Sequence, residues 1–243
     1  MNYIGIIPAR YASTRFPGKP LAMIGGMTMI QRVYNQSGKA LMLSDVYVAT
    51  DDKRIFDHVI GFGGKSLMTS ADHKTGTERC HEAYHLIESE YPIEETIIVN
   101  IQGDEPFIRP EQIDRLTDCF SDPETGIATL KTEITDPADI ADPNIVKVVT
   151  DNKGFAIYFS RSPIPYLRNT SANAPHYYKH IGIYAFRAEI LDKIAALVPE
   201  PCEVAESLEQ LRWLENRMAI KVAVTEFCNI SVDAPEDLYK FVF

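Results

Sequence analysis

The chain has 243 residues, 45% of them hydrophobic, and its 34 acidic side chains outnumber its 24 basic ones, for a net charge of −10. This composition is that of a globular protein and excludes a disordered chain, a collagen and a coiled coil. An acidic chain lacks the basic face that phosphate backbones require, so we expect no nucleic-acid partner. Its apolar runs are shorter than the ~18 residues of a membrane span and no secretory leader is evident, so we expect a cytoplasmic protein without a membrane partner.

Apolar runs alternate with helical patterns in the first part of the chain. Runs bounded by turn-forming residues predict buried strands at 3–8, 46–50, 96–101 and 126–130. Apolar side chains at helical spacing predict helices around 29–34, 55–60 and 77–89. Because strands that alternate with helices form right-handed βαβ units, we predict an α/β fold with a mostly parallel central sheet.

From Asn144 onward the sequence is richer in β-branched and aromatic residues. An Asn-Lys-Gly turn and proline-rich segments separate three predicted strands at 145–149, 155–159 and 178–186. We interpret about 144–186 as a strand-rich insertion, followed by a strong helix at 203–216 and a short closing helix at 235–242. No linker or repeat is evident, which favours one domain over residues 1–243; a division into two domains near Asn144 is the alternative.

The loop after the first predicted strand is basic. The first 44 residues contain no Asp or Glu, whereas Arg10, Arg15 and Lys19 fall within ten residues. Ligands of open α/β sheets bind beyond the carboxyl ends of the strands, and these cations among small residues suit a triphosphate. A solvated basic loop is the alternative. Neither a P-loop nor a dinucleotide-binding glycine pattern is present.

Two carboxylates are candidates for a metal site. Asp104 follows the strand at 96–101 directly, in a turn framed by glycine and proline, and Asp233 precedes a proline-started helix. Mg²⁺ commonly takes one or two carboxylates together with phosphate oxygens of a substrate. The alternative for Asp233 is a helix N-cap that forms a capping box with Glu236.

Residues 81–85 read His-Glu-Ala-Tyr-His, the pattern of zinc proteases. On the predicted helix at 77–89, His81 and His85 fall on the flank away from the apolar stripe, and no third ligand is evident downstream. We therefore expect a solvated helix face, with a zinc protease as the alternative. The preceding polar loop, 70–79, is a further candidate for anion binding because it leads into a helix N-terminus.

Taken together, the motifs resemble the CMP-Kdo synthetases, the 3-deoxy-manno-octulosonate (Kdo) cytidylyltransferases. The resemblance runs through the chain in order. It is carried by IIPARYASTRFPGKPL (6–21), VATD (48–51), TGTER (75–79), VNIQGDEP (99–106), NIVKVV (144–149), YFSR (158–161), KHIGIY (179–184), ESLEQLR (206–212) and VDAPEDL (232–238).

The resemblance implies a Rossmann-like nucleotide-diphospho-sugar transferase fold and a reaction of CTP with Kdo to give CMP-Kdo and pyrophosphate, for lipopolysaccharide biosynthesis. It also implies a Mg²⁺ cofactor and a homodimer that the strand-rich region helps to build. An 8-amino variant of Kdo or a sialate-like 2-keto acid is the alternative substrate, although the Ala-Ser-Thr-Arg stretch at 12–15 differs from the Gly-Ser-Lys pattern of sialate enzymes.

Site residues follow from the same resemblance. It places Arg10, Arg15 and Lys19 on the triphosphate and Ala9 and Gln102 on the cytosine. The metal would be held by Asp104 and Asp233, which with Arg10 and Lys19 form the implied catalytic set. The sugar pocket would be lined by Arg79, Arg161, His180, Tyr184, Glu209 and Gln210, with Arg79 or Arg161 clamping the sugar carboxylate.

Overall fold

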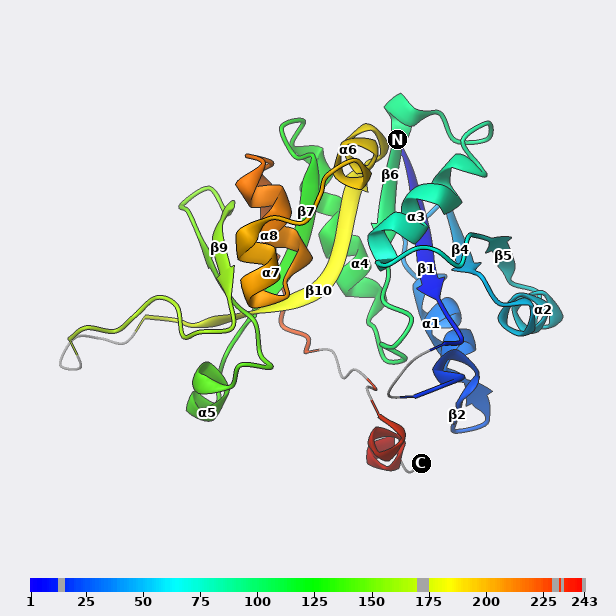
Figure 1. Cartoon of the computed structure of the whole chain (residues 1–243), viewed down its shortest axis with the longest axis horizontal. Coiled ribbons are helices and arrows are strands. Elements are labelled where there is room, and N and C mark those ends of the chain that lie inside the picture. Colours follow the sequence, from blue (N-terminus) through cyan, green and yellow to red (C-terminus); the bar gives the residue numbers. More distant parts are fainter. Residues whose placement is uncertain (13–15, 170–174, 229–231, 233, 242–243) are drawn as a thin grey trace.

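The computed structural model describes residues 1–12, 16–169, 175–228, 232 and 234–241. Residues 239–241 are described by their backbone only. Its main strands are β1 (Asn2–Ala9), β4 (Asp45–Thr50), β5 (Lys65–Met68), β6 (Thr96–Asn100), β7 (Ile127–Glu133), β8 (Lys147–Thr150), β9 (Ala156–Ser160), β10 (Tyr178–Arg187) and β11 (Ile220–Val224). Within these residues they form one sheet in the order β11-β7-β10-β6-β1-β4-β5, and β8 joins it at β10 and carries β9 (Figure 1). A separate hairpin pairs β2 (Met23–Ile24) with β3 (Met27–Thr28).

The sheet is mostly parallel, as predicted. β1 runs parallel to β4 and β6, β4 to β5, and β7 to β11, whereas β10 is antiparallel to both β6 and β7. The strands expected at 3–8, 46–50, 96–101 and 126–130 are present with small shifts of their ends. Two strands of the main sheet, β5 and β11, were not predicted, because half of β5 is exposed and Lys221 interrupts the apolar run of β11.

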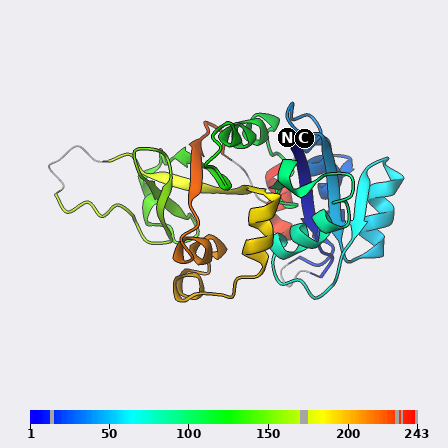
Figure 2. The ribbon, with the colours of Figure 1, turned by 90° about the horizontal axis from the view of Figure 1, so that it is seen from above.

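Helices cover both faces of the sheet. Their bounds are α1 (Met29–Ser37), α2 (Lys53–Gly61), α3 (Gly76–His85), α4 (Pro110–Thr117), α5 (Pro137–Ala141), α6 (Ala188–Ala195), α7 (Pro201–Glu206) and α8 (Glu209–Glu215). Short 3₁₀ turns lie at η1 (Lys19–Leu21), η2 (Ile93–Glu95), η3 (Asp118–Ser121) and η4 (Pro235–Phe241). Seen from above, α4 lies on one side of the sheet and α3, α6 and α8 on the other (Figure 2).

Alternation along the buried strands explains the two layers. In β1, Tyr3 and Ile7 belong to the core beneath α1, α2 and α4, whereas Ile4 and Ile6 belong to the core beneath α3, α6 and α8. Successive side chains of a strand point to opposite faces, so a strand that is apolar on both faces must be covered twice. No helix among the described residues is long and apolar enough to cross a bilayer.

The helix predicted at 203–216 is wrong as a single element. The structure has α7 and α8 instead, separated by Ser207, whose backbone is left-handed at φ 52°. The broken helix places two carboxylates in different directions. Glu206 accepts bonds from the Ser160 hydroxyl at 2.6 Å and the Arg161 N–H at 2.8 Å, whereas Glu209 accepts the Thr77 hydroxyl at 2.9 Å. Helical periodicity in the sequence continues through this break, so the pattern did not reveal it.

The predicted hairpin of the strand-rich region is present as β8 and β9. Its Asn-Lys-Gly turn ends at Gly154, whose φ of +81° favours glycine. Beneath the hairpin lies the fully buried Lys147, whose ammonium donates to the carbonyls of Asp142, Ile145 and Arg161 at 2.5–2.8 Å. Burial lowers the pKa of Lys147. One buried ammonium thus connects the ends of both strands.

Candidate active site

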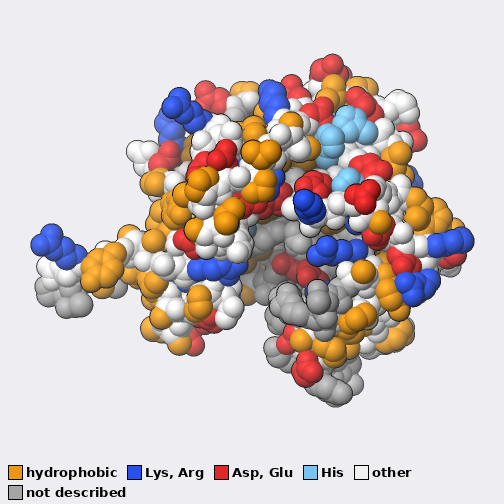
Figure 3. All heavy atoms as spheres, viewed as in Figure 1, with side chains coloured by type: hydrophobic (Ala, Val, Ile, Leu, Met, Phe, Trp, Pro, Cys, Tyr) orange, Lys and Arg blue, Asp and Glu red, His pale blue; other side chains and the backbone are white. Residues whose placement is uncertain are grey.

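A cleft of about 250 Å³ opens at the carboxyl ends of β1 and β6. From β1 the chain crosses to β4 on one side and later returns to β6 on the other, and such switch points are where open α/β sheets bind ligands. Figure 3 shows this face hollowed, with basic side chains on its rim and acidic ones deeper in. The lining residues are Pro8, Ala9, Arg10, Lys19, Pro20, His73, Thr75, Gly76, Arg79, Gln102, Gly103 and Asp104.

An ion pair joins the two loops of the cleft. Lys19, at the start of η1, places its ammonium 2.8 Å from a carboxylate oxygen of Asp104, 85 residues away. The turn that delivers Lys19 has Gly18 at φ +74°. Gly103 leaves room on the other side, because a Cβ there would lie 2.9 Å from the Pro8 carbonyl oxygen. Both glycines therefore hold the loops close enough for the pair to form.

The Gln102 side chain is held against the antiparallel strand β10. Its amide nitrogen donates to the Gly182 carbonyl at 3.0 Å, at a bulge where the pairing of β10 with β7 shifts between Ile181 and Tyr184. Bulges commonly turn a backbone group toward an active site. Gln102 and Ala9 thus lie in the same cleft as Lys19, as the resemblance implies for a base-binding pair.

Asp104 fits a hard divalent cation. Its carboxylate is about one-third exposed to the cleft, and oxygen ligands of this kind suit Mg²⁺. The Asp104 carbonyl also accepts the N–H of Val232 at 3.0 Å, so the C-terminal segment reaches this loop. Asp233 and Arg15, the other residues expected at the metal and the triphosphate, lie outside the described residues.

A second group of predicted residues lies on β10 and α8. Glu209 is buried, which raises the pKa of its carboxyl, and it accepts the Thr77 hydroxyl from α3. The Tyr184 hydroxyl and the Gln210 amide nitrogen are buried without a hydrogen-bond partner among the described residues, as is the side-chain oxygen of Asn100. Buried polar atoms without partners are costly, so this cluster suits a polyhydroxylated ligand that would satisfy them.

His180 is kept neutral by its surroundings. Its Nε2 lies 2.9 Å from the Thr129 hydroxyl, and its ring packs against Phe159 and Tyr184 at centroid distances of 5.0 and 5.3 Å. Burial lowers the pKa of His180 to about 3. A neutral imidazole can exchange hydrogen bonds with a sugar without adding a charge to the pocket.

His180 should make the protein less stable in acid. In the unfolded chain this histidine is protonated below about pH 6.5, whereas in the folded chain it stays neutral down to about pH 3. Its contribution to the free energy of unfolding is therefore fully present above pH 6.5 and is lost as the pH falls below that value. We expect a loss of about 2 kcal/mol between pH 8 and pH 5 from this group. Urea unfolding across that range should show a smaller decline for His180→Gln; an identical decline in both proteins would contradict the assignment.

The two arginines expected on the sugar carboxylate differ in position. Arg79 lines the cleft, although its Nη1 already donates to the Thr69 hydroxyl at 2.6 Å and its Nη2 lies 3.4 Å from Asp51. Arg161 donates from Nε to the Glu206 carbonyl and from Nη1 to that of Pro143, at 2.7 and 2.9 Å. Arg79 is therefore the better placed of the two.

The His-Glu-x-x-His segment differs from the expected solvated face. His81 and His85 both contact Asp192 of α6, so a third potential ligand exists that the sequence did not suggest. Glu82, which would be the general base of a zinc protease, is turned away and bonds to the Ser70 N–H and to His73. Glu82 therefore does not lie beside the two histidines as the general base of a zinc protease would.

Sequence reasoning missed several residues that support the cleft. Asp51 pairs with Arg79, Glu206 holds the end of β9, and the side-chain oxygen of Asn100 has no hydrogen-bond partner in the described part of the chain. Each lies inside a segment that carries the family resemblance, which was the available signal. Their roles depend on partners far along the chain, so no local pattern identifies them.

Comparisons with known proteins agree with this geometry. The family model described as cytidylyltransferase matches residues 4–220. The 3-deoxy-manno-octulosonate cytidylyltransferases of Bacteroides thetaiotaomicron and Parabacteroides distasonis are each 53% identical, over 98% and 99% of this chain and 96% of each relative. A solved CMP:2-keto-3-deoxy-manno-octonic acid synthetase complexed with CTP superposes with a TM-score of 0.92 at 42% identity, over 99% of this chain and 96% of that one.

A more distant solved structure shares the fold alone. A 4-diphosphocytidyl-2C-methyl-D-erythritol synthase matches with a TM-score of 0.65 at 15% identity, over 98% of this chain and 95% of that one. The much closer relatives, which extend over nearly the whole chain, decide the family. The chain belongs to the 3-deoxy-manno-octulosonate cytidylyltransferase family, the CMP-Kdo synthetases.

Proposed function

We propose that this protein couples CTP to Kdo, giving CMP-Kdo and pyrophosphate for lipopolysaccharide biosynthesis. The observation that carries the proposal is the Lys19–Asp104 pair at the switch point of the sheet, in a chain of this family. A cation for the triphosphate and a carboxylate for a metal ion meet there within one cleft. That combination suits transfer of a nucleotidyl group.

The nucleotide would enter along the carboxyl ends of β1 and β6. Arg10 and Lys19 would contact the phosphates and offset the charge that develops on the leaving pyrophosphate, and Arg15 would join them from the same loop. Ala9 and Gln102 would contact the cytosine. The carbonyl of Gly182 accepts a hydrogen bond from the Gln102 amide nitrogen and so orients this side chain. The Oε1 of Gln102 would accept a hydrogen bond from the base.

Asp104 would hold Mg²⁺ together with Asp233. When bound, the ion supplies charge neutralisation and alignment of the reacting oxygens. Asp104 is paired with Lys19 in the protein alone, so phosphate and cation would replace this pair with contacts of their own. The ammonium and the carboxylate are thereby kept in place before the substrate arrives.

The sugar acid would bind against β10, α3 and α8. Its hydroxyls would meet Tyr184, Gln210, Glu209 and neutral His180, and its carboxylate would meet Arg79 or Arg161. In this position the anomeric hydroxyl attacks the α-phosphorus of CTP and loses its proton to solvent. The new P–O bond forms as the bond from the α-phosphorus to the oxygen of the leaving pyrophosphate breaks. The side chains proposed to bind the sugar come from α3 (Arg79), the residue after β9 (Arg161), β10 (His180 and Tyr184) and α8 (Glu209 and Gln210).

We propose a homodimer built in part by the strand-rich region. The segments 161–169 and 175–177 connect β9 with β10 and extend away from the sheet (Figure 1). Tyr166 is 85% exposed on this extension, and Ile157 of β9 is 61% exposed. Exposed apolar side chains on β9 and on the extension that follows it suit a partner surface. Sedimentation of the chain, compared with a Tyr166→Ser variant, would test this assembly.

Pyrophosphate release tests the proposed reaction. Purified protein with CTP and Mg²⁺ should release pyrophosphate with Kdo, far less with N-acetylneuraminate, and none without a sugar. Release with the sialic acid but not with Kdo would keep the reaction class and change the substrate. The proposal would be overturned if pyrophosphate were released with none of the three acids, Kdo, N-acetylneuraminate and 8-amino-Kdo.

Replacing Lys19 with alanine should weaken CTP binding. Loss of one charge-assisted contact to the triphosphate should raise the KM for CTP about 10–100-fold and leave the KM for Kdo nearly unchanged. Lys39→Ala is a matched control, because it removes the same charge from the same acid-free segment at an exposed position whose ammonium bonds only to Gln36 in the described structure. Equal KM values for CTP in both variants would remove Lys19 from the triphosphate site.

A further inference from the structure

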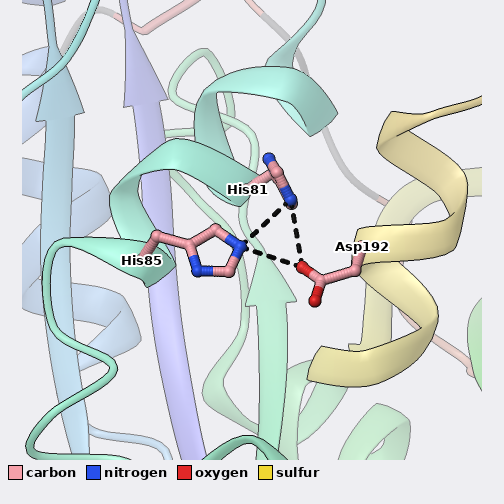
Figure 4. Close-up of side chains that lie close together, drawn as sticks. All are labelled: His81, His85 and Asp192. Atoms are coloured by element: carbon pink, nitrogen blue, oxygen red, sulfur yellow. Dashed lines mark hydrogen bonds and ion pairs between the residues drawn. The ribbon is translucent and has the colours of Figure 1, made fainter.

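The two histidines of α3 and one aspartate of α6 form a convergent cluster outside the cleft. The Nε2 atoms of His81 and His85 lie 3.2 Å apart, and each lies 2.9–3.0 Å from the same Asp192 oxygen (Figure 4). Within the described residues this is a group of three possible ligand atoms that all lie within 4.8 Å of one another. The three residues are half-buried, with side-chain exposures of 30–38%.

Hydrogen bonds leave one contact of this triangle unfavourable. If both Nε2 atoms carry protons, both can donate to the Asp192 oxygen, but the two N–H groups then face each other at 3.2 Å; if one does not, its lone pair faces the carboxylate oxygen. A divalent ion at the centre accepts all three lone pairs at once. Three ligand atoms bound about 2.0–2.1 Å from zinc at tetrahedral angles lie about 3.3 Å apart, close to the separations seen here.

The cluster also has the support that metal-binding histidines commonly have. The Nδ1 of His85 lies 2.8 Å from the Glu88 carboxylate, which fixes the ring with Nε2 toward Asp192. A carboxylate behind a histidine ligand is the usual arrangement that orients the ring and increases its basicity. His81 and His85 are one helical turn apart, so the backbone of α3 holds them rigidly on one side.

A hollow adjoins the cluster and leaves space for a fourth ligand. It is lined by His73, Glu78, His81, Asp192, Ala195 and Ala196. His73 also lines the active-site cleft, so the two spaces adjoin at this residue. The same helix carries Arg79 of the proposed sugar pocket and Thr77, whose hydroxyl donates to Glu209, and α6 follows β10 directly.

We propose that His81, His85 and Asp192 bind a borderline divalent transition-metal ion, Zn²⁺ being the best match, that clamps α3 to α6. Nitrogen and carboxylate ligands in this number favour zinc over the hard Mg²⁺ of the cleft. The site differs from a zinc protease, since Glu82 faces the other way. Its role is to fix the helix that carries Thr77 and Arg79.

Zinc binding to the untagged full-length protein tests this site. Isothermal titration with ZnCl₂ in excess Mg²⁺, which occupies the cleft, should give one ion per chain. His81→Asn, His85→Asn and Asp192→Asn should each weaken binding at least about 100-fold, and Glu88→Gln about tenfold. His176→Asn is the matched control. His176 also pairs with a carboxylate, Glu133, but it is exposed and belongs to no group of three possible metal ligands among the described residues. Its zinc affinity should equal that of the unchanged protein.

Cobalt substitution identifies the ligands without relying on activity. Co²⁺ in the site should give the visible bands of a four-coordinate nitrogen and oxygen site, without the thiolate absorption that exposed Cys228 would produce. Circular dichroism of the histidine variants establishes that they fold. The proposal is overturned if no zinc binds, if binding survives in His81→Asn and His85→Asn, or if a thiolate band appears. None of these outcomes depends on nucleotidyl transfer.

Discussion

Replacing Asp104 with asparagine should lower kcat for pyrophosphate release about 10³-fold or more while the protein stays folded. The substitution keeps the shape of the side chain and removes the negative oxygen that would bind the metal ion, and metal stabilisation of the transition state amounts to several kcal/mol. The KM for CTP should change little, because the Lys19 ammonium remains and one repulsive charge near the triphosphate is gone. Steady-state kinetics with varied CTP and Mg²⁺ measure both quantities.

Asp57→Asn is the matched control for Asp104. Asp57 also pairs with a lysine, Lys53, at 2.7 Å, but on the exposed face of α2 and away from the cleft. Its variant should retain full activity, because exposed pairs of this kind contribute little to stability and this one has no ligand to hold. Activity of Asp104→Asn within a few-fold of the Asp57→Asn value would remove Asp104 from the metal role.

Replacing Lys147 with methionine should lower the free energy of unfolding by about 3–4 kcal/mol. The change preserves most of the side-chain volume but leaves three partly buried carbonyls, those of Asp142, Ile145 and Arg161, without their donor. Each buried acceptor without a partner costs about 1–3 kcal/mol, partly offset because the buried charge itself is removed. Urea denaturation followed by circular dichroism at fixed protein concentration measures the loss.

Lys153→Met provides the comparison on the same hairpin. The Lys153 side chain is exposed at the turn between β8 and β9, so its substitution should change the unfolding free energy by less than about 0.5 kcal/mol. A similar result for Lys147→Met would mean that water replaces the lost donor. Because the Arg161 carbonyl is one of the three acceptors, Lys147→Met should also raise the KM for the sugar acid if Arg161 contributes to that pocket.

Local patterns in the sequence were sufficient for most of the parallel half of the fold, with β5 as the exception. Buried strands such as β1 and β6 are apolar on both faces and flanked by turn residues, and α1 and α2 each have a clear apolar stripe. These signals arise within a single segment. The expected sheet direction and the position of the cleft followed from them, because α/β connections have one hand and ligands bind at one end of the strands.

Features that depend on distant contacts were not predictable in the same way. The left-handed backbone at Ser207 interrupts a helical pattern that continues on both sides of it. Asp192 completes the histidine cluster from 107 residues beyond His85, so α3 alone gave no reason to expect a third ligand. The family resemblance supplied most of the site assignments, and the structure brings six of those residues into one cleft: Ala9, Arg10, Lys19, Arg79, Gln102 and Asp104.

The break at Ser207 makes the spacing between two carboxylates a fixed dimension of the enzyme. Glu206 secures the end of β9, and Glu209, three positions later, secures α3. Insertion or removal of one residue between them would rotate α8 by about 100° and turn one carboxylate away from its partner. The buried Leu208 and the left-handed Ser207 restrict which side chains fit here, and a change of length would in addition reorient α8. The number of residues at this point therefore sets how α8 lies between β9 and α3.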